Sequence, residues 1–222
     1  MPDLKLEKKC GSLVIGIDEA GRGPWAGPVT VTALWLNPQA YDQLPGDIND
    51  SKKVRPARRA SLAAYLQMPP HLHWTISMDV DVIDQLGIMQ ATLLAMTEVT
   101  QKVISLLQEA GFAGPVHALI DGPVLPKNMP CTCQPVVRGD TLSLTIAGAS
   151  IIAKHSRDSI MQKLDTNWPE YGWCTNNGYG TRQHQKALAM HGVSPHHRLS
   201  FAPIRKLFKT ASYRIENLQR HR

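Results

Sequence analysis

Two short apolar runs in this chain each end in carboxylates, and this pattern constrains the fold more than any other feature. Asp18 and Glu19 follow the run at 14–17, and Asp121 follows the run at 116–120. Short continuous apolar runs are typical of buried strands, and an ionised carboxylate is costly in an apolar site unless it is paired or coordinates a metal. We therefore expect an α/β protein with acidic side chains where buried strands end.

The rest of the chain alternates between patterns of strands and helices. Apolar residues at three- and four-residue steps predict a long helix over 88–110 with one buried face. The segment 20–28 is too rich in glycine and proline for regular structure, 176–180 is an expected loop, and the polar, basic residues 217–222 are expected to be disordered. The remaining expected strands are 29–36, 73–78 and 134–138, and the remaining expected helices are 54–67 (begun near Ser51 and stopped by Pro69-Pro70), 147–164, 183–191 and 204–208.

A fourth carboxylate, Asp158, lies within the expected helix 147–164. Hard oxygen ligands in this number suit Mg²⁺ or Mn²⁺, which bind phosphate oxygens and activate water. Each acid alone has an ordinary interpretation: Asp18 as a cap, Asp121 as a turn residue before glycine, and Asp158 as a solvated helix acid. A metal site requires that the fold brings the four acidic side chains close together.

Neighbouring residues of a strand point to opposite faces, which limits how Asp18 and Glu19 can cooperate. They can share one metal site only if the strand is interrupted at Ala20-Gly21. The glycine-rich segment that follows supplies such a break.

The charge balance favours a polyanionic partner. The 222 residues are 43% apolar, enough for one core, and 24 Lys and Arg against 18 Asp and Glu leave a net charge of +6. Because several acids are set aside for the metal site, the remaining surface is more basic than this sum. Composition alone also fits a surface that only keeps the protein in solution.

The cysteines and the apolar segments indicate a cytoplasmic protein. The four cysteines form no CxxC pair and are expected to be free thiols. No apolar run approaches the roughly 18 residues that a membrane span needs, and no amino-terminal apolar segment indicates export. No coiled-coil heptads are present, so a monomer is expected.

Seven strings, in this order and at family-like separations, resemble ribonuclease HII. The resemblance covers about residues 12–205. The strings are Gly16-Ile17-Asp18-Glu19-Ala20-Gly21-Arg22-Gly23-Pro24, Asn49-Asp50-Ser51-Lys52-Lys53, Ile120-Asp121-Gly122, Ala149-Ser150-Ile151-Ile152-Ala153-Lys154, Arg157-Asp158, Gly178-Tyr179-Gly180-Thr181 and His197-Arg198-Leu199-Ser200-Phe201.

The resemblance implies a ribonuclease H-like fold, a mixed five-stranded sheet flanked by helices, with a small carboxy-terminal helical extension. It implies one catalytic domain over 1–222, with a core at about 12–168 and a dependent extension at about 169–212. It also implies an endonuclease that cuts the RNA strand of RNA/DNA hybrids and cuts 5′ to single ribonucleotides in duplex DNA. The expected products carry 5′-phosphate and 3′-hydroxyl ends.

The resemblance assigns roles to individual residues. Asp18, Glu19, Asp121 and Asp158 are the implied metal ligands and catalytic acids, with two Mg²⁺ or Mn²⁺ ions expected when substrate is bound. The triplet 21–23 is implied to embrace the 2′-hydroxyl, and Tyr179 to stack on the next deoxyribose. The expected substrate-binding residues are Gly21, Arg22, Gly23, Lys52, Lys154, Tyr179 and Arg198.

Other residues near these motifs have weaker interpretations. Asp140 matches a recurrent family position but is expected to support the site rather than to bind metal. His196 and His197 are expected to pack or cap the carboxy-terminal part. Further basic or titratable side chains that could neutralise phosphates are Lys53, Arg157, Arg182 and His184.

Three positions depart from the usual pattern of the family. Asn176-Asn177 stand where a His-Lys pair is usual, Arg138 where a lysine is usual, and Gly87 where an asparagine is usual. The missing lysine is expected to weaken one phosphate contact and to leave the chemistry intact. Two rival hypotheses stay open at this point: a nuclease or phosphotransferase of the same broad fold that acts on other substrates, and a hybrid-binding protein without catalysis.

Overall fold

The computed structural model describes residues 1–11 and 13–210, and the expectation for 217–222 lies outside this range. The chain divides into two compact units that are not continuous in sequence. The first comprises residues 1–20, 30–77 and 92–156, and the second comprises 21–29, 78–91 and 157 onward. The expected boundary near residue 168 is not the boundary between these units. The second unit also contains the loop at 21–29 and the end of one long helix, together with the carboxy-terminal helices. The single catalytic domain stays a prediction.

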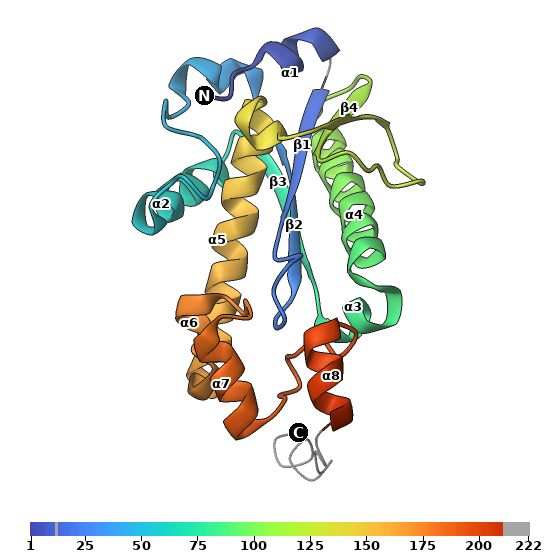
Figure 1. Cartoon of the computed structure of the whole chain (residues 1–222). Helices are drawn as coiled ribbons and strands as arrows, with labels where there is room; N and C mark the ends of the chain where they lie inside the picture. Colours follow the sequence, from blue (N-terminus) through green and yellow to red (C-terminus); the bar gives the residue numbers. More distant parts are fainter. Residues whose placement is uncertain (12, 211–222) are drawn as a thin grey trace. The chain divides into compact units, whose positions relative to one another are not determined.

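The first unit contains a five-stranded mixed sheet flanked by helices, as the resemblance implies (Figure 1). The strand order is β3-β2-β1-β4-β5. β1 pairs antiparallel with β2 and parallel with β4, and β4 pairs parallel with β5. The strands are β1 (Leu13–Ala20), β2 (Val29–Trp35), β3 (Leu72–Met78), β4 (Val116–Asp121) and β5 (Thr132–Val136).

Helices cover both faces of this sheet. On one face α5 (Leu144–Asn167) approaches β1 closely at Gly16, where an added Cβ would overlap the backbone of Thr145. α4 (Ile88–Glu109) buries Met96, Val99 and Val103. Figure 1 shows the strands between these two helices. The smaller elements of this unit are α1 (Lys5–Cys10), η1 (Pro38–Gln43), α2 (Pro56–Leu66) and η2 (Gly139–Thr141).

The second unit is helical and has its own aromatic core. Tyr171 and Trp173 stack with ring centroids 5.0 Å apart, and Met161, Leu188 and Ile204 are buried with them. Besides the end of α5, its elements are α3 (Val80–Leu86), η3 (Pro169–Tyr171), α6 (Trp173–Asn176), α7 (Arg182–His191) and α8 (Ala202–Thr210).

Most expected elements are present, with shifted ends that have local causes. α2 begins at Pro56 rather than near Ser51, because proline fits the first turn of a helix. β5 ends at Val136 rather than at 138, because Arg138 has a left-handed backbone with φ of 59°. The short helices α1, α3 and α6 were not predicted, since helices of this length give no clear periodicity.

Two expectations drawn from composition are confirmed. All four cysteines are free. Among the described residues, no helix combines the length and the apolar character required to cross a bilayer.

Candidate active site

The parallel pairing of β1 and β4 brings two of the predicted acids to the same level of the sheet. Ile17 lies opposite Ile120 in this register. Asp18 and Asp121 are the next residues of the two strands, so their side chains leave the same face at the carboxyl end. The expectation that these acids gather where buried strands end is met for this pair.

Asp18 is buried, and its surroundings disfavour a bare negative charge. Burial raises the pKa of its carboxyl well above the usual value, and the charges of Glu19 and Asp121 raise it further. Hydrogen bonds from the Ser150 hydroxyl and from the backbone of Glu19 act in the opposite direction. A cation would relieve the repulsion among the three acids, which fits a metal-binding role.

Glu19 is less favourably placed than its neighbour. β1 continues through Ala20, which pairs with Thr30, so the strand neither ends nor bends before Glu19. The alternation of side chains along a strand therefore directs the Glu19 side chain away from the face that carries Asp18. Within residues 1–11 and 13–210, no three His, Cys, Asp or Glu side chains converge closely enough to enclose an ion. The acids of the first unit therefore interact electrostatically without forming a closed cage.

Asp121 is oriented by the segment that follows β5. Its Oδ1 accepts a hydrogen bond of 2.7 Å from the backbone N–H of Gly139. Next to Gly139, the pKa of Asp140 is raised overall by burial and by the charges of Asp50 and Asp121, although the charges of Lys52 and Lys53 act in the opposite direction. Asp140 thus lies beside the acids and the basic loop, consistent with the supporting role expected for it.

Ser150 is a site residue to which the sequence reasoning gave no role. Besides its hydrogen bond with Asp18, its hydroxyl lies 2.9 Å from the Ser51 hydroxyl. The backbone of Ser51 is held in turn by buried Arg59, whose Nη1 donates to the carbonyls of Ser51 (2.9 Å) and Val54 (3.1 Å). Both serines lie in strings that resemble the family, and this was the one sign in the sequence that they belong to the site. The loop that carries Lys52 is thereby connected to Asp18.

In the second unit, the loop at 21–28 is fixed by Arg198. The guanidinium is fully buried and donates hydrogen bonds to four carbonyls of this loop, those of Gly21 (2.6 Å), Arg22 (3.0 Å), Pro24 (2.8 Å) and Gly27 (2.9 Å). The substrate contact expected for Arg198 does not fit this position, because a buried guanidinium with four backbone acceptors is not free to bind a phosphate.

A second buried guanidinium, that of Arg157, ties the same loop to the segment after α6. It donates to the carbonyls of Pro28 (2.9 Å), Ala26 (3.1 Å) and Asn177 (3.0 Å). Gly21 has a φ of 98°, and a Cβ there would overlap the Arg157 side chain. Arg157, too, holds the loop rather than offering its charge to a phosphate.

Tyr179 lies beside the glycine-rich triplet, as the role that the resemblance implies for it requires. Its side chain is 49% exposed, and its Cε1 lies 3.4 Å from where a Cβ of Gly23 would be. The backbone N–H of Trp25 donates to the Gly178 carbonyl (2.8 Å), so the two loops are joined. An exposed ring and an exposed stretch of backbone therefore form one surface of this unit.

The remaining predicted site residues are distributed as follows. Lys52 is exposed after the serine loop, and Lys154 is half-buried on α5, one turn after Ser150. In the second unit, Arg22 is exposed and its guanidinium lies 3.9 Å from the Met89 sulfur. Asp158 is half-buried on the part of α5 that belongs to this second unit, so it is not in the unit of the other acids.

The two asparagines that replace the usual His-Lys pair have structural partners. Asn176 is buried, donates to the Tyr171 carbonyl (2.7 Å) and accepts from the Gly178 N–H (2.8 Å). Asn177 adopts a left-handed backbone with φ of 49°, a conformation that asparagine tolerates better than most residues.

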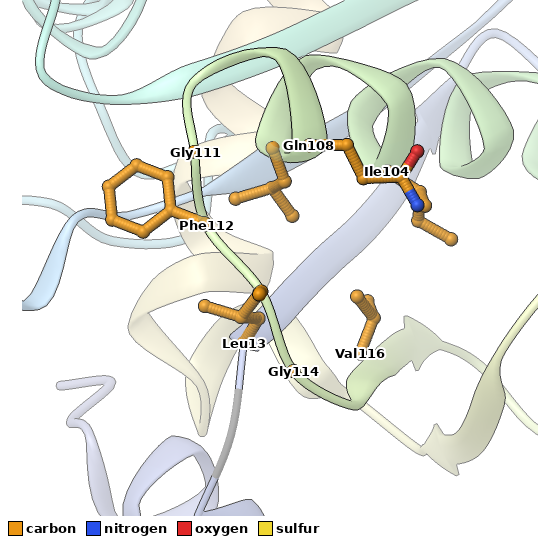
Figure 2. A pocket seen from close by; sticks show the side chains of 9 residues that line it. Leu13, Ile104, Gln108, Gly111, Phe112, Gly114 and Val116 are labelled. Carbon is orange, nitrogen blue, oxygen red and sulfur yellow. The ribbon is translucent and has the colours of Figure 1, made fainter.

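A separate hollow of about 380 Å³ lies at the opposite end of the strands (Figure 2). It is lined by Leu13 and Val116, the first residues of β1 and β4, and by Phe112 and Gln108. Because the two strands are parallel, the acids lie at their other ends. This hollow is not part of the candidate active site.

The sheet topology, with acids at the carboxyl ends of adjacent parallel strands, defines a ribonuclease H-type fold. Two solved structures share it. The ribonuclease H2 from Pyrococcus horikoshii OT3 has a TM-score of 0.66 and 21% identity over 88% of this chain and 97% of that one. Bst-RNase HIII in complex with Mn²⁺ has a TM-score of 0.71 and 16% identity over 91% of this chain and 71% of that one.

Sequence comparison identifies the family within this fold. The model of the family described as ribonuclease HII matches residues 15–204. The ribonuclease HII of Jannaschia sp. (strain CCS1) is 45% identical over 208 residues, which cover 93% of this chain and 98% of that protein. The chain belongs to the ribonuclease HII family, whose members are endonucleases that hydrolyse the RNA of RNA/DNA hybrids.

Proposed function

We propose that this ribonuclease HII cuts 5′ to single ribonucleotides embedded in duplex DNA, in addition to its action on RNA/DNA hybrids. The observation that carries this proposal is the surface formed by Gly23 and the exposed ring of Tyr179. Such a surface can detect one ribose, because it does not depend on a long RNA stretch.

Recognition of the ribose rests on the triplet 21–23. Backbone groups can approach a 2′-hydroxyl closely only where side chains are absent, and Arg198 holds the carbonyls of Gly21 and Arg22. In this proposal the triplet contacts the 2′-hydroxyl and Tyr179 stacks on the next deoxyribose, so the two loops read the junction from RNA to DNA.

Asp18, Glu19, Asp121 and Asp158 are the proposed ligands of divalent ions, Mg²⁺ or Mn²⁺. The donor set fits hard cations. Burial, followed by repulsion from Glu19 and Asp121, raises the Asp18 pKa, and this repulsion supports the role for the acids of the first unit. When bound, two such ions supply an activated water and stabilise the leaving oxygen. Among the protein groups, Ser150 orients the Asp18 carboxyl and Gly139 orients that of Asp121.

The phosphate contacts in this proposal are made by Lys52, Lys154 and Arg22, whereas Arg198 acts through the loop that it holds. Each lysine that neutralises a phosphate steepens the salt dependence of binding by about 0.9 on duplex DNA. The monomeric state and the cytoplasmic location stay predictions.

The test is cleavage of an end-labelled duplex that contains one ribonucleotide, beside an all-DNA duplex and an RNA/DNA hybrid, with Mg²⁺ or Mn²⁺. We expect one cut, 5′ to the ribonucleotide, with 5′-phosphate and 3′-hydroxyl products, and no cut in all-DNA. Asp121→Asn is expected to abolish turnover at unchanged thermal stability. Cleavage of all-DNA at a similar rate would contradict ribose recognition, and binding without cleavage by the wild type would favour a catalytically inactive hybrid-binding protein.

A further inference from the structure

Two buried histidines lie behind Tyr179 and have no role in the proposed chemistry. His184 on α7 and His197 in the segment after it are 0% and 1% exposed. Their ring centroids are 5.1 Å apart. Buried polar groups are retained at a cost unless they are hydrogen-bonded, so their partners indicate what they do.

The proton of His197 can be assigned from its neighbours. The backbone N–H of Ser194 donates to His197 Nδ1 at 2.9 Å, so Nδ1 acts as an acceptor. Burial, with the adjacent His184, lowers the pKa of His197 to about 3, so the ring is neutral at pH 7. A neutral imidazole with an unprotonated Nδ1 carries its proton on Nε2.

This assignment determines the tautomer of His184. His197 Nε2 lies 2.9 Å from His184 Nε2 and donates to it, and the Trp173 indole N–H points at the same nitrogen from 3.3 Å. His184 therefore carries its proton on Nδ1. That nitrogen lies 3.0 Å from the Tyr179 carbonyl oxygen, to which it donates.

The hydrogen bonds thus run in one direction, from Ser194 through His197 and His184 to the backbone of Tyr179. The Tyr179 N–H is held at the same time by the Asn176 carbonyl (2.9 Å). The Tyr179 carbonyl also accepts from the Thr181 N–H (2.8 Å). With both of its backbone groups bound, the backbone of Tyr179, from which the ring projects, is held in place.

We propose that His184, kept in one tautomer by His197, is a positioning residue that sets the place of the Tyr179 ring and thereby the preference for an embedded ribonucleotide. The proposal rests on the stacking role proposed above for Tyr179. Neither histidine touches the substrate.

The alternative is that the two histidines only fill the aromatic core, where His197 lies 4.8 Å from the Tyr171 ring centroid. Both interpretations predict lower stability when His184 is replaced. They differ in whether a replacement that keeps the donor to Tyr179 also keeps substrate preference.

Two variants of His184 separate these interpretations. In His184→Asn the amide nitrogen takes the place of Nδ1 and can donate to the Tyr179 carbonyl, but it does not reach His197. In His184→Gln the amide reaches the place of Nε2 and contacts His197, but the side-chain donor to the Tyr179 carbonyl is lost and only the Thr181 N–H still donates to it. Met190→Gln, at a 77% exposed position of the same helix, is the control.

The measurement is kcat and KM on a duplex with one ribonucleotide and on an RNA/DNA hybrid, well below the melting temperature of each variant. We expect His184→Gln to lower the ratio of the two kcat/KM values about tenfold, the effect of losing about one hydrogen bond. His184→Asn should retain the wild-type ratio within about twofold, although it is also less stable, and Met190→Gln should change neither quantity.

A double-mutant cycle with Tyr179→Ala completes the test. If His184 acts through Tyr179, then His184→Gln should not lower the ratio further in the Tyr179→Ala background. Equal ratios for the Asn and Gln variants, or an undiminished effect of Gln without Tyr179, would overturn the positioning role alone. Failure of the wild type to cut at a single ribonucleotide would instead overturn the proposed function.

Discussion

Replacing Arg198 by methionine tests whether this residue holds the glycine-rich loop or binds substrate. Methionine fills a similar volume but donates no hydrogen bonds, so the carbonyls of Gly21, Arg22, Pro24 and Gly27 lose their donor. Arg198→Met should therefore unfold more easily than the wild type.

The expected loss of stability follows from two opposing contributions. Hydrogen bonds to a charged group contribute about 1.5–3 kcal/mol each. Burial opposes them, because burial and the nearby Arg157 charge lower the Arg198 pKa well below its usual value, to about 9, which corresponds to about 5 kcal/mol. The net loss for four bonds is about 4 kcal/mol, and the melting temperature should fall by about 8–16 °C for a chain of this size.

The assay combines thermal unfolding with binding to a ribonucleotide-containing duplex at several salt concentrations, in buffer with a chelator so that no cleavage occurs. Lys52→Met is the matched variant, since Lys52 is exposed and is the proposed phosphate contact. We expect its salt slope to fall by about 0.9 at unchanged stability. Arg198→Met should show the reverse, with lower stability and an unchanged slope.

One result would refute this reasoning: a fall of about 0.9 in the salt slope of Arg198→Met with less than about 1 kcal/mol of stability lost. Arg198 would then contact a phosphate directly. If the methionine variant does not fold, Arg198→Lys keeps the charge and part of the donor set, and the same comparison applies to it.

Three further predictions concern other parts of the chain. Gly16→Ala should destabilise by about 2–3 kcal/mol because its Cβ meets the Thr145 backbone, whereas Gly46→Ala, with nothing within 4 Å, should not, as urea unfolding will measure. The pKa of His197 in the folded protein is about 3, so only the unfolded chain binds a proton at this residue as the pH falls below about 6.5. Between pH 6.5 and 5 the wild type should therefore lose about 2 kcal/mol more stability than His197→Gln. Equal losses would contradict the assigned neutral ring. Asn177→Lys should steepen the salt slope of binding by about 0.9 and cost about 1 kcal/mol for its left-handed backbone; an unaltered slope would show that no phosphate lies near.

The sequence by itself determined the family and most of the elements. The acid after the run at 116–120 marked the end of β4, whereas β1 continues past Asp18 to Ala20, and the spacing at 88–110 predicted α4 almost to the residue. These features are local, because side-chain periodicity and turn residues act within a few positions of the chain.

Only the tertiary structure decided which of the motif residues are exposed. Arg22 and Arg198 are both arginines next to glycine-rich or polar strings, yet one is exposed and the other is fully buried. The acceptors of Arg198 lie more than 170 residues away in sequence, whereas the partners that fix the tautomers of His184 and His197 lie nearer but on separate turns and helices that only the fold brings together. Burial and hydrogen-bond partners of this kind arise from packing between distant segments, and no local pattern in the chain encodes them.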